Sequence, residues 1–220
     1  EDTRTFLDGN GATLRRYKSH DSTPEHIGFS IAKRQDWEEK AKPFLTPSAD
    51  RINFEVYRET RRRCAEKGRY FTWMGVNVFE MMHPICGHEN MLMNMALDPD
   101  LILEIAGTYA DMTISMMEQL FAAEGKPDGI WFFEDMGFKG RPFMSPDMYC
   151  ELIMPSHKKT IDFAHSLGLP VIMHSCGFVE PLLPHMVEAG IDCLQAMEIK
   201  AGMNLLRIYK NFGEKIALMG

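Results

Sequence analysis

The sequence has neither the excess of basic residues nor the long apolar runs that would tie it to a nucleic acid or a membrane. Its 220 residues contain 24 lysines and arginines against 31 aspartates and glutamates, a formal net charge of -7. Such a chain offers a nucleic acid no electrostatic footprint. No apolar run approaches the roughly 18 to 20 residues of a membrane span, and no signal-peptide pattern opens the chain. We therefore expect neither a nucleic-acid nor a membrane partner.

Cysteine is also scarce, odd in number and irregularly spaced. Without a secretion signal, this pattern predicts a cytoplasmic protein with free thiols or a single metal site. The chain starts at Glu1 without an initiator methionine and ends on the strand-like "KIALMG", so we expect it to be a piece of a longer protein. The five cysteines are Cys64, Cys86, Cys150, Cys176 and Cys193.

From residue 70 onward, apolar strand patterns alternate with helical patterns. This alternation predicts a parallel sheet with helices on both faces. An open doubly wound sheet and a closed (β/α)8 barrel both fit it. Pro155 should kink or divide its helix. Strands are expected at 70–79, 128–137, 169–177, 191–199 and 214–220, and helices at 99–125, 145–168, 179–190 and 201–213.

The first 68 residues follow a different pattern. Two short runs within residues 4–17 flank Asp8-Gly9-Asn10-Gly11, whose residues accept positive φ, so a β-hairpin is expected there. Residues 34–42 predict a short helix that ends before Pro43. A second helix is expected within 46–68, capped by Thr46 or Ser48 and ended by Gly68.

Ionisable and polar residues recur where the expected strands end. In both candidate architectures, function gathers at the carboxyl ends of the parallel strands. The opposite ends carry mostly glycine, proline and aspartate turn residues. This distribution indicates an enzyme site at one rim of the sheet. The residues in question are Asn77 and Glu80, Glu134 and Asp135, His174 and Cys176, and Glu198.

His174 and Cys176 are the most distinctive of these residues. They are two positions apart on a strand, so both side chains should face the same way. An imidazole and a thiolate together suit Zn²⁺, although two ligands alone do not make a site, and capping or packing explains the pair equally well. Cys193 falls at the start of its strand, so it should lie far from Cys176 and share neither a metal nor a disulfide with it.

The acidic pair Glu134 and Asp135 should divide between the two faces of its strand, since successive residues point opposite ways. We assign the site position to Asp135, with loop capping as the alternative. Glu198 is a second candidate catalytic carboxylate. Lys139 and Arg141, in the loop that follows, could bind an anionic substrate or simply be solvated. Asn77 and Glu134 complete the candidate substrate-binding residues.

Two stretches resemble the uroporphyrinogen decarboxylase superfamily. They are "WFFEDMGFKGRPFMSPDMY" and "HSCGFVEPLLPHMVEAGIDCLQAMEIKAGMNLLRIYKNFGEKIALMG", and the resemblance covers about residues 70 to 220. The family fold is a (β/α)8 barrel of the TIM type. The resemblance therefore implies an incomplete barrel over 46–220, with 1–45 as an N-terminal hairpin insertion and linker that decorate it.

This superfamily contains two chemistries. Its decarboxylases bind a porphyrinogen through arginines of an N-terminal motif and an aspartate on the first strand, which this sequence does not show, and they use no H-x-C metal pair. Its zinc methyltransferases move a methyl group from a corrinoid protein to a thiol such as coenzyme M. Their ligands are the histidine and cysteine of H-x-C-G, matched by His174 and Cys176, and a distant cysteine that we expect to lie beyond this chain.

The resemblance thus implies zinc as cofactor, a corrinoid supplied by a partner protein, and a small thiol as substrate. Asp135 and Glu198 would then orient the ligands and the substrate. Uroporphyrinogen decarboxylation, with a tetrapyrrole substrate, is the alternative activity. A relative that only binds a tetrapyrrole or corrinoid, without turnover, is the non-enzymatic alternative.

Overall fold

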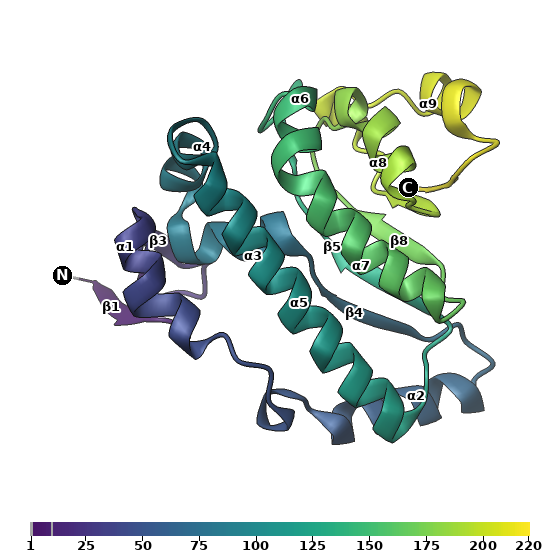
Figure 1. The fold of residues 1–220 in the computed structure, drawn as a ribbon, viewed down its shortest axis with the longest axis horizontal. Helices are drawn as coiled ribbons and strands as arrows, with labels where there is room; N and C mark the ends of the chain where they lie inside the picture. The colour runs from purple at the N-terminus through teal and green to yellow at the C-terminus, as the bar shows by residue number, and fades with distance from the viewer. Residues whose placement is uncertain (1, 10) are drawn as a thin grey trace.

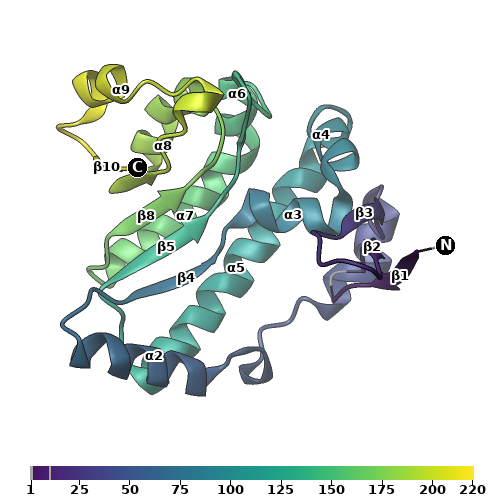
Figure 2. The same ribbon diagram turned by 180° about the vertical axis from the view of Figure 1, so that it is seen from behind.

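The core of the structure is a sheet of five parallel strands whose order follows the chain. The computed structural model describes residues 2–9 and 11–220, and Figures 1 and 2 show it from opposite sides. The sheet runs in the order β10-β9-β8-β5-β4, with every neighbouring pair parallel. All five expected strands are thus present: β4 (Thr72–Val76), β5 (Gly129–Phe133), β8 (Val171–His174), β9 (Cys193–Gln195) and β10 (Ala217–Met219).

The long crossover helices cover one face of this sheet. Helices α5 (Pro99–Glu124) and α7 (Met154–Ser166) lie in front of the strands in Figure 1 and behind them in Figure 2. The expectation of helices on both faces is therefore wrong for these crossovers. The physical reason is the strand order. It never reverses, so successive right-handed crossovers stay on the same side of the sheet.

The long helices begin and end where the sequence predicts. The side chain of Asp98 accepts a hydrogen bond from Leu101 N at the start of α5, and the helix stops before Gly125, whose φ is 81°. The helix expected over 145–168 is divided into α6 (Pro146–Met148), a π-helical turn η4 (Tyr149–Ile153) and α7, with Pro155 in the first turn of α7. Pro155 therefore divides this segment, as predicted. Helices α8 (Leu183–Ala189) and α9 (Leu205–Phe212) complete the series.

The strand expected over 70–79 is shorter than predicted. It ends at Val76, and the next residues form α3 (Val78–Cys86) and α4 (His88–Leu97) where a loop was expected. The carboxylate of Glu134 accepts hydrogen bonds from Phe79 N at 2.8 Å and Glu80 N at 2.9 Å. This distant acid satisfies the first turn of α3, so tertiary structure overrides the strand preference of Val78 and Phe79.

The N-terminal hairpin is present and belongs to a larger sheet. Strands β1 (Thr3–Leu7) and β2 (Thr13–Tyr17) pair antiparallel, and β3 (Glu25–Gly28), which was not predicted, pairs with β2. Of the expected turn residues, Asn10 lies outside the described residues. The chain then runs through α1 (Arg34–Asp36), the π-helical turn η1 (Trp37–Ala41) and the 3-10 turn η2 (Lys42–Phe44).

Ion pairs fasten this N-terminal segment to α5. Arg34 contacts Asp98 at 2.7 Å and Glu104 at 2.9 Å, and the indole of the buried Trp37 donates to Glu104. The following helix starts later than predicted. Ser48 caps only the 3-10 turn η3 (Ala49–Arg51), and Asn53 caps α2 (Phe54–Glu66). Among the helices that the structure describes, none has both the length and the apolar character needed to cross a membrane.

Candidate functional site

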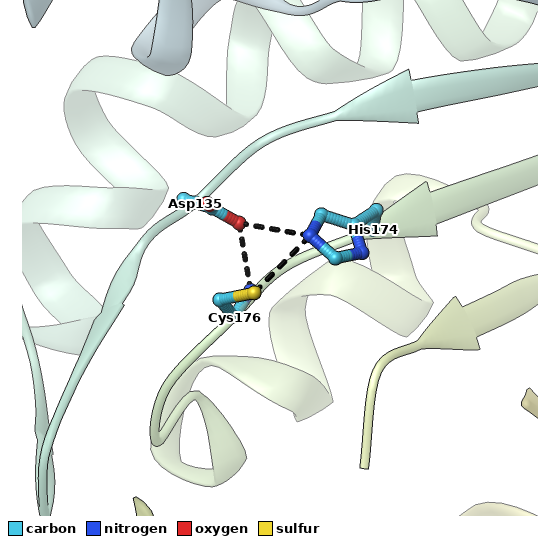
Figure 3. Close-up of side chains that lie close together, drawn as sticks. All are labelled: Asp135, His174 and Cys176. Carbon is cyan, nitrogen blue, oxygen red and sulfur yellow. Dashed lines mark hydrogen bonds and ion pairs between the residues drawn. The ribbon is translucent and has the colours of Figure 1, made fainter. Parts of the chain in front are cut away.

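Asp135, His174 and Cys176 meet where β5 and β8 end. Phe133 and His174 are partners in the register of these strands, so the residues that follow them leave the sheet side by side. The ligand atoms of the three side chains all lie within 4.8 Å of one another. His174 Nε2 is 3.3 Å from Asp135 Oδ1 and 3.2 Å from Cys176 Sγ, and Figure 3 shows the three side chains converging.

Strand alternation places these three residues on the same side. In β5 and beyond, Ile130, Phe132 and Glu134 are fully buried under the helices, whereas Trp131, Phe133 and Asp135 are only partly buried. In β8 and beyond, Val171, Met173 and Ser175 are fully buried, and Ile172, His174 and Cys176 are not. The site therefore lies on the face that α5 and α7 leave uncovered.

Two glycines allow the loops after β5 and β8 to approach each other. Gly177 has φ 81°, and a Cβ atom added to it would lie 2.3 Å from the carbonyl carbon of Gly137. The backbone also joins the loops, since Cys176 N donates to Asp135 Oδ1 at 2.7 Å. This bond fixes the carboxylate of Asp135 beside the thiol of Cys176.

Gln195 orients the imidazole of His174. The two residues are partners in the register of β8 and β9, and His174 Nδ1 donates a hydrogen bond to Gln195 Oε1. The other nitrogen, Nε2, is then directed toward Asp135 and Cys176. A metal-binding histidine usually has such an outer partner, which sets the tautomer and the ring orientation.

Burial and negative surroundings keep the thiol of Cys176 protonated when no cation is near. Burial, together with the charges of Asp135 and Glu198, raises the pKa of Cys176 to about 11. Glu198 is held at this rim because its Oε2 accepts a hydrogen bond from Gly177 N at 2.7 Å. A cation would offset these charges and favour the thiolate.

The three donors fit a zinc ion. They supply one nitrogen, one sulfur and one oxygen, which is a donor set that Zn²⁺ accepts, and catalytic zinc sites combine three protein ligands with one open position. The side chain of Asp135 is 41% exposed and that of His174 is 17% exposed, so the cluster is open to a further ligand. The sequence predicted Asp135 as a catalytic carboxylate; its geometry also makes it a possible ligand.

The structure does not bring Asn77 and Glu134 into this cluster. Glu134 is fully buried, where it bonds the start of α3 and the ring of His157. Asn77 is 2% exposed and lies 3.3 Å from the hydroxyl of Thr160. Both side chains therefore link the strand ends to α3 and α7 in the interior.

Lys139 and Arg141 lie on a short hairpin above the sheet. The hairpin is formed by β6 (Gly137–Phe138) and β7 (Arg141–Pro142), and both basic residues are exposed. Arg141 borders a groove of about 740 Å³ whose other walls are mainly apolar. The role of Lys139 and Arg141 in binding an anionic substrate stays a prediction.

Sequence reasoning missed one residue of the site, Gln195. Gln195 was not singled out, because its role follows from the register between β8 and β9, which the sequence does not state. The sequence placed Glu80 at a strand end without a role. In the structure it lies in the first turn of α3, beside His83.

The sequence correctly separated Cys193 from Cys176. Cys193 starts β9 opposite Ile172, and all five cysteines are free.

Comparisons with known proteins place this geometry in a family context. Residues 76–220 match the uroporphyrinogen decarboxylase (URO-D) family. A methylated-thiol–coenzyme M methyltransferase of Methanosarcina mazei is 30% identical over 115 residues, which are 52% of this chain and 29% of that protein. A solved structure of a methyltransferase from Methanosarcina mazei has a TM-score of 0.65 and 16% identity, covering 96% of this chain and 59% of its own.

These matches confirm the resemblance expected from the sequence. At 16% identity, the solved structure shows a shared fold and nothing more. This chain spans less than two thirds of the length of either relative.

Proposed function

The chain belongs to the uroporphyrinogen decarboxylase family, and on that premise we propose that it acts as a zinc-dependent methyltransferase, moving a methyl group from a corrinoid protein to a thiol. The convergence of Asp135, His174 and Cys176 carries this proposal. The name of the 30% identical relative, a methylated-thiol–coenzyme M methyltransferase, supports it. Porphyrinogen decarboxylation, the alternative, would leave the histidine and cysteine pair without a role.

We also propose that the sheet is part of a (β/α)8 barrel over residues 46–220, with residues 1–45 as its decoration. The strand order follows the chain, and β4 and β10 each pair on one side only within the described part of the sheet. A rim at the carboxyl ends of barrel strands is where TIM-barrel enzymes hold their active sites. The open face of the sheet would then line the interior of the barrel.

In this proposal the chain's own residues prepare the acceptor. Zinc, when bound, supplies the Lewis acidity that lowers the pKa of a thiol placed in its open position. His174 binds through Nε2 while Gln195 holds its ring. Cys176 would bind the metal through Sγ. Asp135 would supply an oxygen ligand in the place of the distant cysteine that the family resemblance implies. Glu198 fixes the loop at Gly177, so the donors stay in place when the thiol arrives.

The metal content of the purified protein tests this proposal. We expect about one zinc per chain in the wild type and none in Cys176→Ala. Cys64→Ala is the matched control, because Cys64 lies on α2 away from the site, and it should keep the metal. The wild type should also demethylate methylcobalamin when a thiol is added, and the absorbance of the corrinoid reports this transfer.

A contrary result is equally clear. A wild-type protein that binds no zinc, or a Cys176→Ala variant that transfers the methyl group at the wild-type rate, would overturn the methyltransferase proposal. Decarboxylation of a porphyrinogen by the zinc-free protein would establish the alternative.

A further inference from the structure

His174 stands in a row of three side chains that the register of the sheet sets side by side. Phe133 on β5 and Gln195 on β9 are its register partners on the two neighbouring strands. Register partners of a parallel sheet point to the same face, and all three side chains are partly buried. His174 therefore has an aromatic neighbour on one side and a hydrogen-bond acceptor on the other.

The ring of Phe133 makes an edge contact with the imidazole of His174. The two ring centroids are 5.4 Å apart, and the angle between the ring planes is 65°. Aromatic pairs prefer such a tilted arrangement to a face-to-face one. The imidazole directs Nδ1 to Gln195 on β9, so the opposite edge of the ring, which carries Cδ2, faces Phe133 on β5. Phe133 has no hydrogen-bonding group to offer to that edge.

The contact with Phe133 bears on which way the imidazole can turn. A half-turn about the Cβ–Cγ bond of a histidine exchanges Nδ1 with Cδ2 and Nε2 with Cε1. After such a turn, Nδ1 of His174 would lie against the apolar ring of Phe133 without an acceptor. Cε1 would stand where Nε2 now faces Asp135 and Cys176 (Figure 3). The turned ring would thus lose its hydrogen bond and its metal donor together.

Trp131 contacts Phe133 from two positions earlier on the same face of β5. Its ring centroid lies 6.1 Å from that of Phe133, with 51° between the planes. Within the part of the chain that the structure describes, the indole Nε1 is buried and donates no hydrogen bond. An unpaired buried donor is costly, so packing must hold this indole in place. Trp131 and His174 therefore contact Phe133 from two sides.

We propose that Phe133 is a positioning residue of the metal site, which holds the imidazole of His174 in the orientation that presents Nε2 to a cation. Gln195 attracts Nδ1, and Phe133 withholds an acceptor from the turned ring, so both neighbours favour the same orientation. Only this orientation can bind the metal, so the apparent affinity falls with the fraction of rings that are turned. This role rests on the proposed zinc site, and Phe133 performs it before the metal arrives.

Nuclear magnetic resonance of the zinc-free protein, with ¹³C-labelled histidine, tests the orientation directly. In the wild type, the Cδ2–H of His174 should show a nuclear Overhauser contact to the ring of Phe133 and none to Gln195. Phe133→Gln offers an amide acceptor to the turned ring, so in this variant the Cδ2–H should gain a contact to Gln195. Val76→Gln is the matched control. Val76 is the register partner of Phe133 on β4, so the same amide is placed on the same face but one strand farther from His174.

Zinc affinity, titrated with a competing chelator, provides the second measurement. Phe133→Gln should bind zinc about 3- to 10-fold more weakly than the wild type, since it loses an aromatic contact and admits the turned ring. Phe133→Leu loses the aromatic contact but offers no acceptor, and its loss should stay below about threefold. Phe133→Tyr keeps the ring and should retain the affinity, as should Val76→Gln.

Three outcomes would overturn the role of Phe133. The first is a wild type in which Cε1–H, rather than Cδ2–H, contacts the ring of Phe133. The second is a folded Phe133→Gln variant with the wild-type orientation and zinc affinity. The third is an equal loss of zinc in Phe133→Gln and Val76→Gln, because any amide on this face would then have the same effect. A wild type that binds no zinc would instead contradict the methyltransferase proposal, and the zinc-free spectra would still decide whether Phe133 sets the ring.

Discussion

The two faces of the five-stranded sheet are built from the same strands but serve different ends. Under α5 and α7, β5 presents Ile130 and Phe132, which are fully buried, and on the other face it presents Trp131 and Phe133, which are not. The difference continues beyond the strand, where Glu134 is enclosed and Asp135 is open. Stability is therefore concentrated on the covered face, and the candidate chemistry on the open face.

The same division runs through β8. Met173 and Ser175 are fully buried, while His174 and Cys176 are partly exposed and meet Asp135. Alternation with period two thus assigns a role to each residue on both strands, including residues just after the strand has ended. Neighbouring residues on opposite faces make matched pairs for testing this division.

The largest difference in stability is expected between Phe132 and Phe133. Phe132→Ala should lower the free energy of unfolding by about 3 to 5 kcal/mol, since it opens a cavity in a closed core. Phe133→Ala should cost about 1 to 2 kcal/mol, because a partly exposed ring loses only part of its transfer free energy. Urea denaturation measures both variants, and equal losses would show that the open face is packed as tightly as the covered one.

The acidic pair should divide in the same way, with a smaller effect on stability. Glu134→Gln places an amide N–H₂ against the buried N–H groups of Phe79, Glu80 and His157, which should cost about 2 to 4 kcal/mol. Asp135→Asn should change stability by less than about 1 kcal/mol, because its Oδ1 can still accept from Cys176 N.

For zinc affinity, the order of these two variants should be the opposite of their order for stability: Asp135→Asn should have the larger effect. Asp135→Asn replaces a charged oxygen donor with a neutral one, and we expect a loss at least on the order of tenfold, which even an outer-shell partner can cause. Titration with a competing chelator measures it. If Glu134→Gln lowers the zinc affinity of the folded protein more than Asp135→Asn does, Glu134 belongs to the metal site.

The sequence was sufficient to divide these residues between the faces. His174 and Cys176 are two positions apart, so alternation along a strand places them on the same face. Glu134 and Asp135 are adjacent, so alternation places them on opposite faces. Alternation requires only that the strand be identified, and the apolar runs before both pairs identify it. The roles of Asp135 and Glu198 in catalysis stay predictions.

Long-range pairings were the part that the sequence could not supply. Val78 and Phe79 favour a strand by their local preference. They are helical because Glu134, more than fifty positions away, accepts hydrogen bonds from the backbone N–H groups of Phe79 and Glu80 in the first turn of α3. Gln195 faces His174 only because β8 and β9 pair in one particular register. A single sequence carries local preferences and periodicity, but it does not state which distant residues become partners.

Gln195 contacts His174 on the open face of the sheet, so its replacement should change the zinc affinity. Gln195→Ala removes the acceptor of His174 Nδ1, and we expect zinc affinity to fall by about 10- to 100-fold. Gln195→Glu keeps an acceptor in place and should retain most of the affinity. If both variants lose zinc equally, the imidazole is oriented by something other than this hydrogen bond.

The smallest expected effect comes from Ser175, which lies between the two ligands but faces the other way. Its hydroxyl is fully buried and accepts a hydrogen bond from Met136 N at 3.0 Å. Ser175→Ala leaves that buried N–H without a partner, so the free energy of unfolding should fall by about 1 to 2 kcal/mol. Zinc affinity should stay close to that of the wild type, because no donor atom is removed and the neighbouring side chains keep their direction. The contrary outcome is a Ser175→Ala variant that unfolds like the wild type but loses zinc as Gln195→Ala does. The geometry of the ligands would then depend on a contact made on the covered face, and the two faces would not be separate at this point.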